Sequence, residues 1–342
     1  MLCYFISKKD FAILNCVEVE SISCAKNLDC GGKTKISIAG NPAASDEDFV
    51  IVKDGNKVVF QGIIEAIDNA DGETKHSVSC LEIEQMFSRQ IFLTDANIIS
   101  ATGIEDFIAT AIQKNFSASG DDFIDMKYIN INVLTHTKVN AKPATESGIY
   151  NLKTYIGNAK QHYGIFIDFE FTKENLNITI HKKEQSPMQI DTAFTDVVSI
   201  KETYKVKVLS KLSVIWKNTT TNAETKRYFY LHSDRSVSEV NTDRIDGTIS
   251  TKYIEAETEA EMIEAARNEF KNNSYSHAIE AQFIASSKIF PANELYVGHE
   301  VKIRTFAGVK DSIISEISTS DSSDVIAVKF GILKVTLTDK LK

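Results

Sequence analysis

The sequence predicts a mainly β protein in which two similar β modules, at opposite ends of the chain, flank a small α+β module. Three observations predict this class. Apolar and polar residues alternate in short runs at both ends, as in antiparallel strands joined in hairpins. Helical periodicity appears only in the middle and in one later segment. A β segment near the amino terminus also has an echo near the carboxy terminus.

The echo has an offset of 250 residues. At that offset Gly62–Cys80 (GIIEAIDNADGETKHSVSC) lies over Ser312–Phe330 (SIISEISTSDSSDVIAVKF). Each piece reads as an apolar strand, a polar turn with Asp, and a second strand, preceded by a short two-part run (VIVKDGNKVVFQG and VKIRTFAGVKD). This suggests a duplicated building block, which would allow a ring with more copies of the module than of the chain.

Residues 1–95 are predicted to be all β. The strand candidates are FAILNCVEVE, KTKISIAG, FVIVKDG, KVVFQGIIEAI and HSVSCLEIE. The tripeptide Asp54-Gly55-Asn56 stands between two apolar runs and predicts a hairpin turn, because glycine tolerates positive φ.

Residues 96–195 change character and predict the α+β module. Apolar residues at helical spacing predict helices over 103–116 and about 149–163. Two strands, IFIDFEFT and LNITIHKK, follow and are joined through residues 173–175.

Residues 196–342 return to β character, with a helix inserted at about 251–275. The strand candidates before the helix are VVSIKETYKV, KLSVIWKNTT and KRYFYLH. The helix is predicted over 255–273, where Thr258 and Glu261 have the spacing of a capping box. HAIEAQFIA and the terminal hairpins follow it, with apolar alternation at Val301, Ile303 and Ile313–Ile317.

Amino-acid composition and net charge exclude some classes of function. The 342 residues are 43% apolar and 25% charged, as in an ordinary globular protein of two to four domains. The net charge of −9 argues against binding to phosphate backbones, which needs clustered Lys and Arg. The start is unlike a signal peptide, and no apolar run approaches the roughly 20 residues that span a bilayer. We expect a soluble protein made in a cytoplasm.

Motifs for chemistry are weak. The GGKT at 31–34 lacks the earlier glycine and the following helix of a phosphate-binding loop, which favours a turn between strands. The five cysteines are odd in number and none has the two-residue gap of a zinc pair, so we expect reduced cysteines in β structure. Cys80 lies in a predicted strand rather than at the helix start that would activate a thiol.

Histidine and carboxylate sites are equally unsupported. The seven histidines are scattered and include no HExxH. The acidic turn 120–125 lacks the spacing of a calcium loop. Glycosidase carboxylates need spatial proximity, so no pair is singled out among the 47 acidic residues. We therefore predict no catalytic, cofactor-binding or metal residues.

One aromatic group stands out in the later β region. Trp216 and the run Tyr228-Phe229-Tyr230 are candidates for core packing, for a subunit interface or for a sugar-binding platform.

The chain resembles the tail-hub, or baseplate-hub-like, family of tailed bacteriophages and prophages, which also forms the amino-terminal part of tail-associated lysins. The residues that carry the resemblance are Val50–Ile67 and the ending Val297–Leu341. Phe330-Gly331 and the closing LTDKL at 337–341 match the family's ending, and the helix before the last strands also fits. The resemblance covers the whole chain in the order of its secondary-structure elements, and about 70 residues in their amino-acid sequence.

The resemblance implies a homotrimeric virion structural protein of the tail tip. Each chain would supply two similar β-barrel-like tube domains, 1–95 and 196–342, with the domain 96–195 packed outside. Three chains would make a pseudo-six-fold ring that adapts a six-fold tube to a three-fold tip. The implied neighbours are the distal tail or tail-tube protein, the tape-measure protein, and a tip or fibre protein, with no sequence-specific nucleic-acid binding.

The resemblance implies no enzyme, although many tail-associated lysins continue into a peptidase or muramidase domain. In this sequence Lys342 comes directly after the hub-like ending. Two other functions stay open: a cell-wall hydrolase with carboxylates in 96–195, and a carbohydrate-binding module of a tail tip that uses Trp216 and Tyr228–Tyr230.

Overall fold

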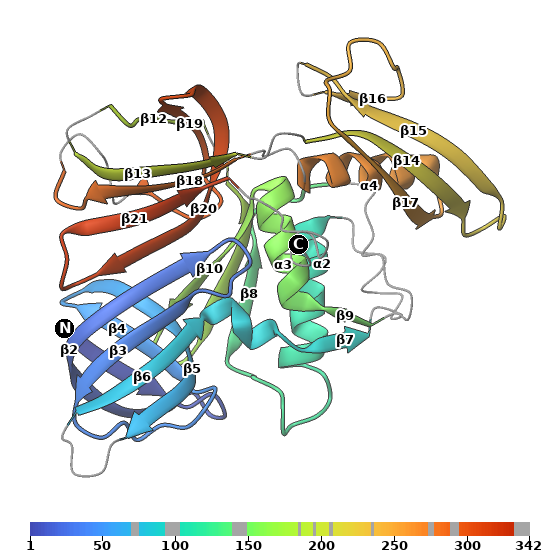
Figure 1. Ribbon diagram of the computed structural model, residues 1–342. Coiled ribbons are helices and arrows are strands. Elements are labelled where there is room, and N and C mark those ends of the chain that lie inside the picture. The colour runs from blue at the N-terminus through green and yellow to red at the C-terminus, as the bar shows by residue number, and fades with distance from the viewer. Residues whose placement is uncertain are drawn as a thin grey trace. The chain divides into compact units, whose positions relative to one another are not determined.

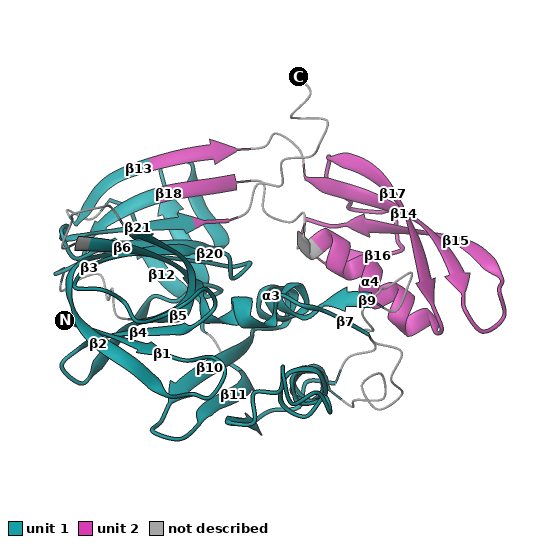
Figure 2. Cartoon of the chain, turned by 90° about the horizontal axis from the view of Figure 1, so that it is seen from below, with its two compact units in different colours: residues 1–138, 145–200, 281–329 teal, residues 139–144, 201–280, 330–342 magenta. Residues whose placement is uncertain are grey.

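A computed structural model describes residues 1–69, 75–92, 103–138, 149–183, 186–193, 196–204, 208–233, 236–272, 277–287 and 294–331. The chain divides into two compact units (Figure 2). Unit 1 comprises residues 1–138, 145–200 and 281–329, and unit 2 comprises residues 139–144, 201–280 and 330–342.

The amino-terminal strands form a closed barrel of six strands, drawn in blue in Figure 1. Its strands are β1 (Leu2–Ile6), β2 (Ile13–Asn27), β3 (Lys33–Ala39), β4 (Phe49–Asp54), β5 (Lys57–Asn69) and β6 (Lys75–Glu82). Their order is β1-β4-β5-β6-β3-β2, and a β1–β2 ladder closes the ring. Every neighbouring pair is antiparallel. The predicted turn after Asp54 joins β4 to β5, with Gly55 at φ +57°.

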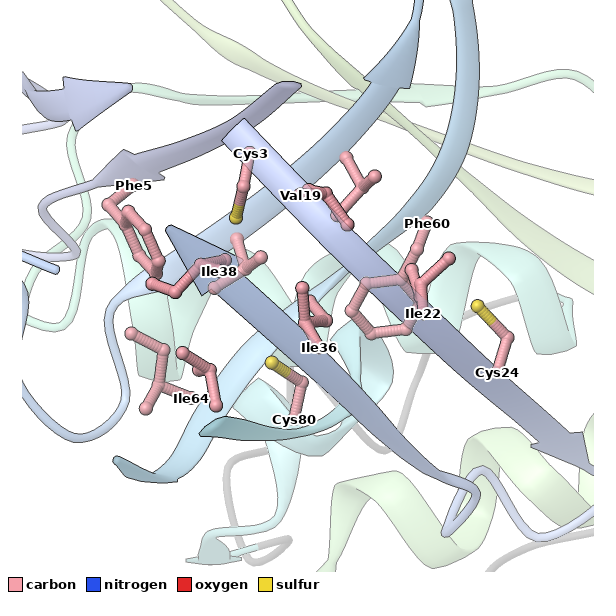
Figure 3. Close-up of a cluster of buried hydrophobic side chains, with 13 residues drawn as sticks. Cys3, Phe5, Val19, Ile22, Cys24, Ile36, Ile38, Phe60, Ile64 and Cys80 are labelled. Atoms are coloured by element: carbon pink, nitrogen blue, oxygen red, sulfur yellow. The ribbon is translucent and has the colours of Figure 1, made fainter. Parts of the chain in front are cut away.

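The barrel interior is apolar and contains three of the cysteines (Figure 3). Cys3, Cys24 and Cys80 lie among Phe, Ile and Val side chains, because alternate residues of each strand face inward. All five cysteines are free thiols, and only Cys16 is exposed. Reduced cysteines in β structure were predicted; Cys3, Cys16, Cys24 and Cys80 lie in strands, whereas Cys30 lies in the turn between β2 and β3.

The carboxy-terminal strands repeat this arrangement. They are β12 (Met188–Asp191), β13 (Val197–Tyr204), β18 (His277–Ile284), β19 (Glu300–Thr305), β20 (Gly308–Ser320) and β21 (Val325–Phe330). Their order is β12-β19-β20-β21-β18-β13. If the six strands of each module are numbered in chain order, both modules have the same spatial order, 1-4-5-6-3-2. Two differences remain: β12 is parallel to β19, and no β12–β13 ladder occurs among the described residues.

The register of the matching hairpins explains the echo in the sequence. Lys53 faces Val58 in β4–β5, as Arg304 faces Val309 in β19–β20, an offset of 251 residues. The β4–β5 ladder has a bulge between the Val52 and Lys53 pairs. On the far side of this bulge, the β5 residues correspond to β20 residues at an offset of 250, so Gly62 corresponds to Ser312. A bulge inserts one extra residue, so the change of offset marks a single insertion in an otherwise matching pair of hairpins.

Between the two β modules lies the α+β part. Its elements are β7 (Gln90–Phe92), α2 (Ile104–Ile112), a π turn η2 (Gln113–Ser117), β8 (Ile129–Val133), β9 (Ile149–Asn151), α3 (Leu152–Tyr163), β10 (Ile165–Phe171) and β11 (Leu176–Lys182). Strands β10, β11 and β8 form one small sheet and β7 pairs with β9. The predicted hairpin is confirmed, and the helix predicted from 149 begins at Leu152, because Asn151 caps it by accepting from the Thr154 amide (3.1 Å).

The insertion between β13 and β18 is a sheet as well as a helix. It contains β14 (Leu209–Asn218), β15 (Glu224–Leu231), β16 (Val237–Ser238), β17 (Thr248–Ala256) and α4 (Glu259–Asn272). The buried face of this sheet packs against Met262, Ala266 and Phe270 of α4. The predicted capping box is present, because the Glu261 amide donates to Thr258 Oγ1 and the Thr258 amide to Glu261 Oε2.

The expected fold class is confirmed: mainly β with α+β insertions and two similar barrel-like modules. The helix predicted over 255–273 is shorter, because residues 255 and 256 belong to β17. The ending at 337–341 lies outside the described residues. In the described part of the chain, no helix is both long and apolar enough to cross a membrane.

Candidate functional site

A backbone seam joins the two β modules within unit 1. The far ends of β2 and β20 pair antiparallel, from Ser23 opposite Ser320 to Asn27 opposite Glu316. The Leu28 amide extends the seam by donating to the Ser315 carbonyl (2.9 Å). Each long strand therefore serves its own module at one end and the seam at the other, so the two modules are fused edge to edge.

A buried ionic junction ties helix α3 to the end of the first barrel. The Lys160 ammonium lies 3.3 Å from Glu84 Oε1 and 3.3 Å from Cys30 Sγ. The side chains of Lys160 and Glu84 are 8% and 11% exposed. Next to them, Glu82 Oε1 accepts from the Asn27 and Gly32 amides of the β2–β3 turn (3.0 and 2.9 Å).

The pKa shifts follow from this burial. Burial by itself lowers the pKa of Lys160, but neighbouring charges, chiefly that of Glu84, outweigh it and raise the pKa above its ordinary value. Burial, with the Glu84 charge, raises the pKa of the Cys30 thiol to about 12. Burial also raises the pKa of Glu82 to about 7, and its two amide donors only partly offset that. The junction is an ion pair with a neutral thiol beside it.

Aromatic rings fasten the α+β part to the same barrel. Phe11 stacks on Tyr128 at 4.5 Å and on Phe171 at 5.8 Å between ring centres. Phe49 of β4 meets Phe171 edge to face at 5.4 Å. Such pairs add about 0.5–1.5 kcal/mol beyond the area they bury, so rings and ion pair together hold this contact.

The sequence candidates for nucleotide and thiol chemistry are structural. Gly31 and Gly32 form the β2–β3 turn that was predicted, and their amides donate to Asn27 and Glu82. Cys80 is fully buried in β6, and burial raises the pKa of its thiol well above the ordinary value. Neither group is arranged to act on a ligand.

In the acidic turn 120–125, the Asp125 carboxylate accepts hydrogen bonds from the neighbouring backbone. Asp125 accepts from the Ser119 amide and hydroxyl (2.8 and 2.6 Å), and its pKa is lowered chiefly by that hydroxyl. The His299 ring stacks on Tyr296 at 4.4 Å. Among the described residues, no group of three or more His, Cys, Asp or Glu side chains is placed to hold a metal ion.

Of the three roles left open for this aromatic group, core packing holds for Trp216 and Phe229, which belong to the cluster against α4, whereas Trp216 and Tyr228 do not share one platform. In the β14–β15 ladder Trp216 lies opposite Thr225, whereas Tyr228 lies opposite Ser213, one residue out of phase. Trp216 therefore shares the face that packs against α4, and its Nε1 donates to the Ala256 carbonyl (3.0 Å). Tyr228 lies on the other face beneath Lys211, whose Nζ is 4.7 Å from the ring centre.

Sequence reasoning missed the residues of the junction. Lys160 follows Ile156 by four residues and so lies on the apolar stripe of its helix, which was a usable signal. Glu82 and Glu84 sit beside the buried Ile83 without any pattern that separates them from exposed acids. Their partners lie 50 to 76 residues away along the chain, so spacing alone does not reveal them.

Comparison with solved structures finds a similar fold in tail proteins. The chain matches prophage tail protein gp18 of Listeria monocytogenes EGD-e with a TM-score of 0.58 and 10% identity, over 100% of this chain and 97% of that one. It matches a tail protein of Neisseria meningitidis MC58 (0.57, 9%, over 96% of each chain). It also matches the 43 kDa tail protein of prophage MuSo2 from Shewanella oneidensis (0.54, 12%, over 96% and 98%).

The chain shares the fold of these tail proteins. No family model matches the sequence, and no curated protein matches it. The likeness is therefore one of fold, over nearly the full length of both partners, at identities too low to carry residue roles. The seam, the repeated strand order and the buried junction are features of this chain itself.

Proposed function

We propose that this protein is a structural component of a phage or prophage tail tip. Three chains would form a pseudo-six-fold hub ring that joins the tail tube or distal tail protein to the tip and lets DNA pass. The tube domains would be residues 1–95 and 196–342, the second completed by β12 (Met188–Asp191) from the segment 96–195 that lies between them in the sequence. The observation that carries the proposal is the strand-for-strand repeat fused by the β2–β20 seam.

The fused repeat has a direct consequence for symmetry. One chain already holds two similar modules side by side, so a closed ring of three chains presents six modules. Three copies carry three times −9, or −27, charges. Repulsion of phosphate by such a ring suits a passage through which DNA slides without adhering.

The partners follow from the same proposal. The ring would contact the distal tail or tail-tube protein on one side and a tip or fibre protein on the other, next to the tape-measure protein. It would act in the virion after synthesis in the host cytoplasm, without catalysis.

Light scattering on a size-exclusion column, over a wide range of protein concentration, tests the ring. We expect a trimer, or a shift toward one as concentration rises, because assembly depends on concentration. Electron micrographs of the trimer peak should show rings with six similar lobes. A strict monomer at the highest concentration, combined with absence of the chain from purified tails, would contradict the proposal. Cleavage of peptidoglycan would favour the hydrolase instead.

A further inference from the structure

Two strand edges carry no ladder in the described part of the chain. Of the described strands, β13 pairs with β18 alone. The ladder of β5 with β4 ends at Ile63, and backbone bonds to residues 47–48 end at Ile64. Among the residues that the structure describes, β5 from Glu65 onward therefore pairs with β6 alone. Open edges of this kind accept a further strand unless something covers them.

The repeat makes these two strands the counterparts of the strands in the seam. β2 is the second strand of its module and β20 is the fifth, as β13 is the second and β5 is the fifth. The seam uses the edge of β2 away from β3 and the edge of β20 away from β21. The open edges face away from β18 and from β6. Each open edge is thus the edge that its counterpart uses in the seam.

The register of the seam predicts which residues would meet. β5 corresponds to β20 at an offset of 250, as the matching hairpins show. β2 corresponds to β13 at an offset of 178, where VESI at 19–22 lies over VVSI at 197–200. In the seam Ala25 lies opposite Ser318. The same pairing between the open edges places Thr203 opposite Asp68.

The side chains at this predicted contact are complementary. Tyr204, which is 41% exposed, would lie opposite the half-buried Ile67. Aromatic and β-branched residues stabilise a sheet when they face each other across two strands. On the other face the exposed Lys201 would stand diagonal to the exposed Asp68, within reach of a long side chain. Opposite charges would therefore meet beside the apolar pair.

We propose that β13 of one chain pairs antiparallel with the far end of β5 (residues 65–69) of a second copy, so that the seam within the chain recurs between chains. This proposal rests on the proposed ring and names the strands that close it. β2 and β20 already join the two modules of one chain, which leaves β13 for one neighbour and β5 for the other. Such a head-to-tail contact uses two different surfaces and closes into a ring when its rotation allows. The ring would then have six joints of one kind, three within chains and three between them.

Thiol crosslinking of the full chain tests the pairing. Cys16→Ser first removes the one exposed thiol among the five cysteines. In that background Thr203→Cys is combined with Asp68→Cys, and the matched control combines Thr203→Cys with Val58→Cys at the other, exposed end of β5. A short bis-maleimide should give a covalent ladder that ends at the trimer for the first pair and should leave the control pair uncrosslinked. A ladder that stops at the dimer, equal yields for both pairs, or crosslinks only within single chains would overturn the proposal.

A charge exchange separates this proposal from the ring itself. Asp68→Lys sets a second cation against Lys201 and should raise the dissociation constant of the trimer about three-fold, since like charges across two strands repel. Adding Lys201→Glu to Asp68→Lys should restore the parent value, which a defect in folding would not allow. If Asp68→Lys trimerises like the parent and the first cysteine pair gives no crosslink, the pairing is wrong although the ring stands. If the parent forms no trimer in solution or in tail particles, the proposed function fails and the pairing fails with it.

Discussion

The two β modules share a register, yet their outer faces differ. In β4 the outward residues Phe49 and Ile51 are buried, whereas their counterparts in β19, Glu300 and Lys302, are exposed. The cause is the neighbour: Phe49 packs against rings of the α+β part. The sequence reflects this, because β4 reads as a continuous apolar run and β19 alternates. A repeated backbone therefore carries two surfaces, one closed inside the chain and one open to solvent.

The loops between matching strands differ as well. In the first module a short turn joins β2 to β3, and it contacts the buried junction through Cys30. In the second module the corresponding connection, residues 205–276, holds a separate sheet and helix. The connection between the second and third strands therefore differs between the modules. In the first it is a short turn that contacts Lys160 of α3, and in the second it is the inserted sheet and helix.

Breaking the ion pair should have the largest effect. Lys160→Met leaves the Glu84 carboxylate buried without its cation, and such losses are about 3–5 kcal/mol. We expect that decrease in the free energy of unfolding of unit 1, measured by urea unfolding together with hydrogen exchange at the Asn27 and Gly32 amides. The double variant Lys160→Met, Glu84→Gln should recover most of it. Equal stability of the single variant and the parent would show that the junction is solvated.

Exchanging one matched pair of residues sharpens the comparison. A side chain at Gly62 would place its Cβ 2.2 Å from the Leu81 carbonyl oxygen, whereas Ser312 occupies the same position in the second module. Gly62→Ser should destabilise the first barrel by about 1–3 kcal/mol through overpacking. Ser312→Gly removes a buried side chain and costs about 0.5–1 kcal/mol of backbone entropy, without any overpacking. Urea midpoints compare the two, and a larger loss for Ser312→Gly would mean that the modules are not equivalent there.

The sequence predicted much of this fold because local patterns decide it. Strand alternation, the Asp54-Gly55-Asn56 turn and the Thr258 and Glu261 cap depend on residues close together in the chain. The sequence left open whether Trp216 and Tyr228 share a face, because that depends on strand parity across the β14–β15 ladder. The partners of Lys160 could not be predicted, because they depend on which end of the barrel packs against α3. That contact is part of the tertiary structure and leaves no local pattern in the sequence.

The smallest expected effect is a change with pH at the β2–β3 turn. Burial raises the pKa of Glu82 from its ordinary value of 4.5 to about 7, so between these pH values the folded state holds this proton while the unfolded state loses it. The stability that Glu82 contributes is therefore complete below about pH 4.5 and falls as the pH rises toward 7. Glu82→Gln removes this titration and keeps an oxygen for the two amides.

The stability of Glu82→Gln relative to the parent should therefore increase between pH 5 and pH 8, by about 1–2 kcal/mol. Urea unfolding at several pH values measures it. Glu65→Gln provides the matched loss of one carboxylate from the same barrel, on exposed β5, where Glu65 pairs with Lys33. If the relative stability of Glu82→Gln fell with pH, Glu82 would be held as a carboxylate by its amide donors.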